Sequence, residues 1–199
     1  MKKGEIIKFG EYDWRILDVQ GGKALLITEY IISMMPYNKI SKSITWESCD
    51  LRNQLNLWFL HKLGIEQKKI TETVIHNPAN LWYKTAGGGD TADKLFLLSI
   101  DEAERYFGDG KDYQIKNRKK CINGQYTEDI GGEYISNADN FGRAASYNGE
   151  KCWWWLRSSG FKDDTAASVE EDGAVCVRGS LVDGGLFHGG VRPAMWIKI

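Results

Sequence analysis

Cysteine, histidine and proline are scarce in this chain, and long apolar runs are missing altogether. It has four cysteines among 199 residues, at positions 49, 121, 152 and 176, and none belongs to a C-x-x-C pair. This spacing argues against a disulfide scaffold or a zinc ribbon and favours reduced, buried thiols. A membrane-spanning helix needs about 20 mostly apolar residues in succession. No such run occurs, so we expect no membrane span.

The three histidines are far apart, which argues against a metal centre. His61, His76 and His188 show no H-E-x-x-H spacing, and no G-x-S-x-G or P-loop motif occurs either. We therefore predict no catalytic residue, no cofactor and no metal. The alternative is a structural calcium ion, because oxygen ligands suit calcium. The acids near the C-terminal strands that could supply such ligands are Asp163, Asp164, Glu170, Glu171, Asp172 and Asp183, but solvated turn acids are the preferred interpretation.

The charge is balanced. Twenty-six basic and twenty-seven acidic residues leave a formal net charge of -1 at pH 7. This balance gives no electrostatic reason to expect nucleic acid or an anionic membrane as a partner. The amino-terminal residues 1–10 include three lysines but no apolar stretch long enough for a signal peptide. We expect a cytoplasmic protein, or an exported one whose signal has been removed.

Strand-like runs lie at both ends of the chain. Residues 5–10, 12–20 and 23–30 are rich in β-formers and separated by turn residues, which predicts a β-meander. Residues 152–158, 165–171, 174–180 and 191–199 predict further strands, with a hairpin turn at "EEDG". The composition, with 42% hydrophobic residues, is sufficient for a core. We predict one α+β domain over residues 1–199 whose two ends meet in one sheet.

Two helices are expected between these strands. In the first, Thr45 is a candidate N-cap, Leu51, Leu55, Trp58 and Phe59 share one face, and Gly64 ends the helix. The second covers residues 100–107 and begins with a capping box of Ser99 and Glu102. Residues 93–99, "DKLFLLS", form a compact apolar run that predicts a strand. Residues 108–150 are rich in Gly, Asn and Lys and predict a long irregular region.

Several motifs in a fixed order carry a family resemblance. They are "TWESCDLRNQLN", "DKLFLLSIDEAERYF", "WWLRSSG" and "GGVRPAMWIKI", and together with "YDWRILDVQGGKALLITEY" they span nearly the whole chain. In these the chain resembles a bacterial domain-of-unknown-function family that is similar in fold to C-type-lectin-like domains, in the branch of the formylglycine-generating enzymes. The resemblance implies a mixed sheet core, two helices and long irregular loops, but no particular reaction. The family commonly has proline where Ser159 stands, so the local turn is expected to differ.

The "CWWWLRSSG" stretch supplies the main candidates for a binding site. Strand alternation places Trp153, Trp155 and Arg157 on one side, and Trp154 and Leu156 on the other, which we expect to be core. Trp153 is expected to be more exposed than Trp155. Trp155 and Arg157 are expected under a cleft that residues 179–190 roof, with Arg192, beside Trp196, on a nearby strand.

Two interpretations of this face remain open. Indoles and guanidinium groups can form a recognition pocket for carboxylate, sulfate or sugar hydroxyl groups. The same residues can instead form a buried Arg–carboxylate network that braces the loops, with the tryptophans as core. The first predicts a non-catalytic recognition domain that binds a small polar ligand, a glycan or a protein surface. Its ligand-binding residues would be Trp153, Trp155, Arg157, Asp183, His188 and Arg192. The alternatives are an enzyme of unknown reaction and a structural module of a surface or phage-related assembly.

Overall fold

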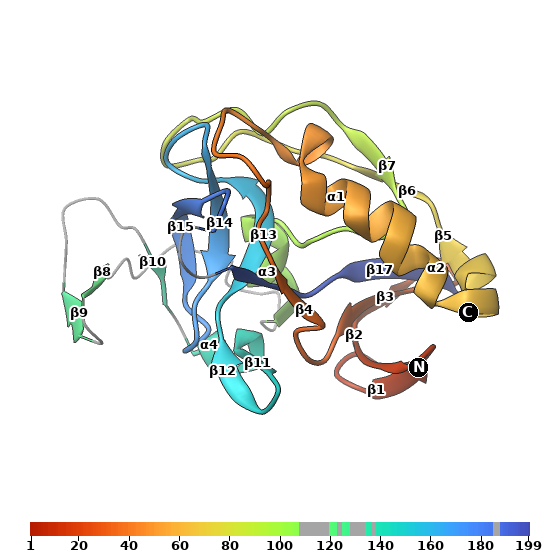
Figure 1. The fold of residues 1–199 in the computed structure, drawn as a ribbon. Helices are drawn as coiled ribbons and strands as arrows, with labels where there is room; N and C mark the ends of the chain where they lie inside the picture. Colours follow the sequence, from red (N-terminus) through yellow and green to blue (C-terminus); the bar gives the residue numbers. More distant parts are fainter. Residues whose placement is uncertain (108–119, 123–124, 128–133, 137, 185–187) are drawn as a thin grey trace.

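A computed structural model describes residues 1–107, 120–122, 125–127, 134–136, 138–184 and 188–199 (Figure 1). The fold is mixed α+β, with most of its strands in two larger sheets. The five-stranded sheet consists, in spatial order, of β1 (Ile6–Phe9), β2 (Tyr12–Gln20), β3 (Lys23–Thr28), β17 (Ala194–Lys198) and β5 (Ile70–Thr71). The six-stranded sheet consists of β10 (Tyr134–Ile135), β15 (Val175–Leu181), β14 (Thr165–Val169), β13 (Trp154–Ser159), β16 (Gly189–Val191) and β4 (Ser33–Met35).

Three two-stranded ribbons and several short helices complete the described part of the chain. The ribbons pair β11 (Ala145–Tyr147) with β12 (Glu150–Cys152), β6 (Thr73–Ile75) with β7 (Thr91–Asp93), and β8 (Lys120–Ile122) with β9 (Gln125–Thr127). The helical segments are η1 (Trp46–Ser48), α1 (Asp50–Gln54), η2 (Leu55–Phe59), α2 (Leu60–Lys62), η3 (Gly64–Lys69), α3 (Ile100–Phe107) and α4 (Asn140–Arg143). The β8–β9 ribbon, β10, α4 and β11 thus lie within residues 108–150, the region predicted to be irregular. Residues 108–119, 123–124, 128–133 and 137 of that region are outside the described residues.

The amino-terminal meander is confirmed, and the last strand joins it. β1, β2 and β3 pair in antiparallel order, and β17 pairs with β3 along its whole length, from Ala194 opposite Ile27 to Lys198 opposite Lys23. The Ile199 amide also donates to the Gly22 carbonyl oxygen at 3.0 Å. The two ends of the chain therefore share one sheet, as predicted, and Figure 1 shows both termini at the same side of the molecule.

The six-stranded sheet is mixed because one pairing in it is parallel. β13 runs antiparallel to β14 but parallel to β16, with Trp154 opposite Gly190. The "EEDG" turn joins β14 to β15 as predicted: the Glu170 amide donates to the Ala174 carbonyl oxygen, and Gly173 takes a φ of +85° that favours glycine. Buried apolar side chains from both sheets form one continuous cluster.

The first predicted helix is interrupted, and its start differs from the prediction. A π-helical segment, η2, separates α1 from α2. Leu55 and Phe59 are buried as expected, but Trp58 is 52% exposed, because the wider π turn rotates the face that a regular helix would present. Thr45 makes no capping hydrogen bond; instead the Cys49 sulfur accepts from the Arg52 amide at 3.4 Å and caps α1.

Residues 95–99 are buried, but they do not form the regular strand that was predicted over residues 93–99. After β7 ends at Asp93, the chain makes a single bridge between Phe96 and Ala194. Leu97 and Leu98 are fully buried, and the Leu98 carbonyl oxygen accepts from the Arg157 amide. The capping box that follows is confirmed. The Ser99 amide donates to the Glu102 carboxylate at 3.0 Å, and the Glu102 amide donates to the Ser99 hydroxyl at 3.1 Å.

Candidate functional site

The tryptophans of β13 belong mainly to the interior. Trp154 and Leu156 are fully buried, which confirms the prediction for that face. Trp155 is also fully buried, and its indole N–H donates to the Met35 carbonyl oxygen at 2.9 Å. Trp153 is half-buried and packs edge-on against Trp155, with ring centroids 4.7 Å apart. It is thus the more exposed of the pair, as expected.

Arg157 does not lie with Trp155 under one cleft. A register shift between Trp155 and Ser159 interrupts the strict alternation along β13. Trp155 packs against Tyr37, whereas the Arg157 guanidinium lies beside Phe96, 5.9 Å from the ring centroid. No described residue of the 179–190 segment is among the side-chain partners of Arg157, so the predicted roof over it is wrong.

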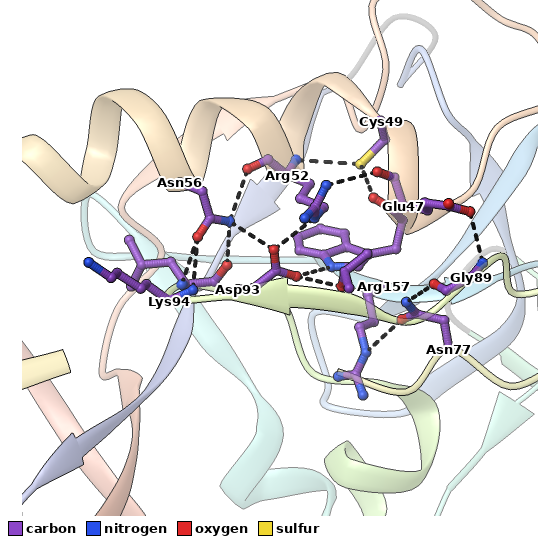
Figure 2. Close-up of polar contacts among 12 residues, drawn as sticks. Glu47, Cys49, Arg52, Asn56, Asn77, Gly89, Asp93, Lys94 and Arg157 are labelled. Carbon is purple, nitrogen blue, oxygen red and sulfur yellow. Dashed lines mark hydrogen bonds and ion pairs between the residues drawn. The ribbon is translucent and has the colours of Figure 1, made fainter. Parts of the chain in front are cut away.

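All five N–H groups of the Arg157 guanidinium have acceptors. Its Nε donates to the Asn77 side-chain oxygen at 3.2 Å, a contact that Figure 2 shows. One Nη donates to the Leu97 carbonyl oxygen at 2.8 Å and to Glu102, and the other donates to Glu102 at 3.0 Å and to the His76 carbonyl oxygen at 3.3 Å. The surrounding residues leave no room for a water-sized molecule. This is the geometry of a brace, in which the capping carboxylate of α3 also neutralises a buried cation.

A second buried network fixes α1 to the chain beneath it (Figure 2). The Asp93 carboxylate accepts from the Trp46 indole at 2.9 Å, the Arg52 Nε at 2.8 Å and the Thr91 hydroxyl at 2.7 Å. The Asn56 amide nitrogen donates to the Leu95 carbonyl oxygen at 2.8 Å. Because the carboxylate has a cationic partner and several donors, this network stabilises the fold and leaves little to offer a ligand.

Arg192 is the other buried arginine that the sequence singled out, and its partners are different. Its guanidinium donates to three backbone carbonyl oxygens: from Nε to Thr28 at 2.8 Å, and from the two Nη atoms to Arg143 at 3.1 Å and Glu29 at 3.2 Å. It makes no hydrogen bond to a carboxylate in the described part of the chain. The other two of its five N–H groups have no acceptor among these residues.

Two aromatic rings lie close to this guanidinium. Its central carbon lies 5.3 Å from the Phe107 ring centroid and 5.2 Å from the Trp154 ring centroid. The residue is 1% exposed, and burial lowers the pKa of the Arg192 guanidinium to about 10, while the nearby Glu29 acts to raise it. The group is therefore still a cation at neutral pH. A buried cation without a hydrogen-bonded carboxylate is unusual in a protein interior.

Arg192 borders a cavity of about 440 Å³. This cavity, which we call the Arg192 cavity, is bounded by β2, the segment after β3, α4 and the β11–β12 ribbon. The residues that line it are Arg15, Glu29, Tyr30, Phe141, Gly142, Ala144, Ala145, Ser146, Gly149, Lys151 and Arg192. The Arg15 guanidinium forms a two-contact ion pair with Glu29 at its edge. Tyr30 and Phe141 are 56% and 85% exposed, so two aromatic rings are available to a ligand.

The remaining predicted site residues lie apart from this cavity. Asp183 is half-buried in the turn after β15, and His188 is exposed just before β16. Trp153 and Trp155 both pack against Gly189, where a Cβ atom would stand 2.5 Å from Trp153 and 2.4 Å from Trp155. The structure thus brings the two tryptophans together but separates them from Arg157 and from Arg192.

Sequence reasoning missed most of the cavity residues. Arg15 lies on β2 and Glu29 directly follows β3, and an arginine between the apolar residues Trp14 and Ile16 was a usable signal for a paired charge. Phe141 and Lys151 lie in the part of the chain without periodicity, so no pattern marked them. Tyr30 follows a strand end and carries no signal of its own.

Metal and thiol chemistry find little support in the described residues. No group of three or more His, Cys, Asp or Glu side chains lies close enough there to hold a metal ion. Burial raises the pKa of Cys49 and of Cys176 to about 12, so both thiols are protonated at neutral pH and are poor nucleophiles. Cys49, Cys152 and Cys176 are free thiols, and the side chain of Cys121 lies outside the described residues.

Comparison with protein families identifies the chain. The model of DUF6273, a domain of unknown function, matches residues 21–199. The chain belongs to the DUF6273 family. The match covers both larger sheets except β1 and β2, and it includes all cavity residues but Arg15. Neither a curated protein nor a solved structure matches this DUF6273 chain. No helix among its described residues has the length and apolar character needed to cross a membrane.

Proposed function

We propose that this protein is a non-catalytic recognition domain that binds a small polar ligand in the Arg192 cavity. The observation that carries the proposal is that Arg192 is buried and has unused hydrogen-bond donors. Its guanidinium borders the cavity, is nearly fully buried, and keeps two N–H groups without an acceptor among the described residues. A buried donor without a partner costs about 1–3 kcal/mol, which a ligand that accepts from it can recover.

The size and lining of the cavity support the same function. Pockets for small molecules usually enclose about 300–1,000 Å³ and combine apolar walls with a few polar groups. The Arg192 cavity falls within that range and combines aromatic rings with the Ser146 hydroxyl and charged groups. Arg157, whose donors are all used, is assigned here to bracing the loop around Asn77 and the start of α3 rather than to binding.

The C-type-lectin-like arrangement is part of this proposal. The mixed second sheet and the long connections between strands agree with what the resemblance implies. Within that arrangement, the Arg192 cavity would replace the tryptophan face of β13 as the recognition surface, because the indole N–H groups of Trp154 and Trp155 already donate to backbone oxygens.

A nuclear magnetic resonance screen tests the proposal. Sugars, amino acids, small carboxylates and their amides would be added to the isotope-labelled protein, and amide shifts would be mapped. We expect a binder to shift Tyr30, Ser146 and Gly149, which line the cavity. The variant Ser146→Phe fills the cavity without changing its charge and should abolish the shifts. Ser180→Phe, at another half-buried strand serine, is the control. Absence of any binder, or equal binding by Ser146→Phe, would overturn the proposal.

A further inference from the structure

The charges that line the Arg192 cavity are unequal in number. Arg15, Lys151 and Arg192 are cations, and Glu29 is the one carboxylate among the described lining residues. Glu29 is committed to Arg15, with the Arg15 Nε donating to it at 2.8 Å. The pairing leaves Arg192 and Lys151 without a carboxylate as a hydrogen-bond or ion-pair partner in the part of the chain that the structure describes, although Glu29 lies near Arg192. With three cationic side chains and one carboxylate in its lining, the cavity is electropositive.

Arg192 and Lys151 lie at different depths in the cavity, and both can contact an anionic group of a ligand. Arg192 is buried at the cavity wall near two aromatic rings, where low polarity strengthens an interaction with an anion. Lys151 is exposed on β12, opposite Ser146 of β11, and can approach the same anion from the rim. A guanidinium with unused N–H groups prefers a carboxylate, sulfate or phosphate oxygen over a neutral hydroxyl.

The aromatic side chains indicate what the rest of the ligand looks like. Tyr30 and Phe141 line the cavity with most of their surface exposed, 56% and 85% respectively. Exposed rings beside a cavity offer stacking area to a flat apolar group, which a bare inorganic anion or a polyol does not use well.

We infer that the ligand of the Arg192 cavity is a small organic anion with one acidic head group and a flat apolar body. The head group accepts from the free N–H groups of Arg192 and lies near Lys151, and the body packs against Tyr30 and Phe141. This inference rests on the proposed function, since it names the ligand class for the same cavity.

A matched pair of probes separates charge from shape. 3-Phenylpropionate carries a carboxylate on an aromatic body. In 3-phenylpropionamide a neutral amide of similar shape takes the place of that carboxylate. Affinities would be measured by calorimetry, and contact residues by amide shifts. We expect the acid to bind about tenfold more tightly than the amide, and acetate, which lacks the ring, to bind more weakly than the acid.

Variants of the rim lysine complete the test. Lys151→Met should weaken the binding of the acid by about threefold to fivefold and leave the affinity for the amide unchanged, as expected for the loss of one exposed charge. Lys151→Arg should keep the affinity for the acid that the unchanged protein has. Lys198→Met, which removes an exposed lysine from β17 away from the cavity, is the control.

The outcomes distinguish the inference from the function on which it rests. If the amide binds the cavity as tightly as the acid, the anion inference is wrong while the recognition function stands. If neither probe binds and no other small polar compound shifts the cavity amides, both are wrong. If acetate binds as tightly as 3-phenylpropionate, the apolar body is not part of the recognised ligand.

Discussion

At the scale of single residues, Trp154 and Trp153 differ in what their removal should cost. Trp154 is fully buried, and its indole N–H donates to the Arg143 carbonyl oxygen at 3.1 Å. Trp154→Ala should lower the free energy of unfolding by about 3–5 kcal/mol, because a large cavity forms in the core. Trp153→Ala, at a half-buried ring, should leave the fold intact. Urea unfolding measures the free energy of unfolding of both variants, and equal decreases for the two would contradict the assignment of Trp154 to the core and Trp153 to its edge.

The buried cysteines lead to a second prediction at this scale. With a pKa of about 12, Cys49 and Cys176 hold almost no thiolate at pH 8. Their alkylation in the native protein should be slower than that of a free thiol by a factor on the order of a thousand or more, before burial is counted. Mass spectrometry of peptides after timed iodoacetamide treatment checks this. Rapid native labelling at either position would show that the thiol is exposed, and labelling after unfolding is the control.

At the scale of elements, β17 holds the amino-terminal sheet together. It lies between β3 and β5, and its Met195 and Ile197 are buried, as is Val191 of β16, while Trp196 is half-buried. Each buried apolar side chain stabilises by about 1.5–3 kcal/mol, against a total stability of about 5–15 kcal/mol. Deletion of residues 191–199 should therefore unfold the whole protein. Circular dichroism and thermal melting measure the effect.

The control for this deletion removes residues 1–3, which are exposed. That truncation should melt like the intact chain. A protein without residues 191–199 that keeps native melting behaviour would instead show that the chain is modular, and that the prediction of one domain over residues 1–199 is wrong.

The elements that the sequence predicted are those whose signals are local. The meander follows from alternation and from the turn at Gly21 and Gly22, and the start of α3 follows from its capping box. By contrast, β4, β5 and β16 are two or three residues long, and their pairing depends on partners distant in the chain. The π-helical break in the first helix also depends on tertiary packing, so helical spacing alone predicted a buried Trp58.

The candidate site was predictable only in part, for a similar reason. Sequence marked Arg157 and Arg192 as equivalent, because each lies near tryptophans in a C-terminal strand-like segment. Their difference depends on which acceptors surround them: the side chains of Glu102 and Asn77 for Arg157, and backbone carbonyls alone for Arg192. Backbone acceptors carry no residue signal, so no pattern in the chain could separate a brace from a binding group.

At the scale of the whole molecule, the two buried arginines Arg157 and Arg192 occupy different positions. One anchors the 76–87 loop and α3 to β13, and the other lies where the carbonyl groups of Thr28, Glu29 and Arg143 meet beside the cavity. Of these two arginines, we propose that only Arg192 is free to contact a ligand. The internal comparison of Arg157 with Arg192 is therefore more informative than any change made to one alone.

The most direct measurement follows the guanidinium signals of these two arginines by nuclear magnetic resonance while 3-phenylpropionate is added. Arg157→Lys and Arg192→Lys spectra assign the signals. We predict that the Arg192 resonances shift and that its N–H protons exchange more slowly with water, while those of Arg157 stay unchanged. A shift at Arg157 with none at Arg192, or no change at either while the amides of Tyr30 and Ser146 shift, would contradict the account.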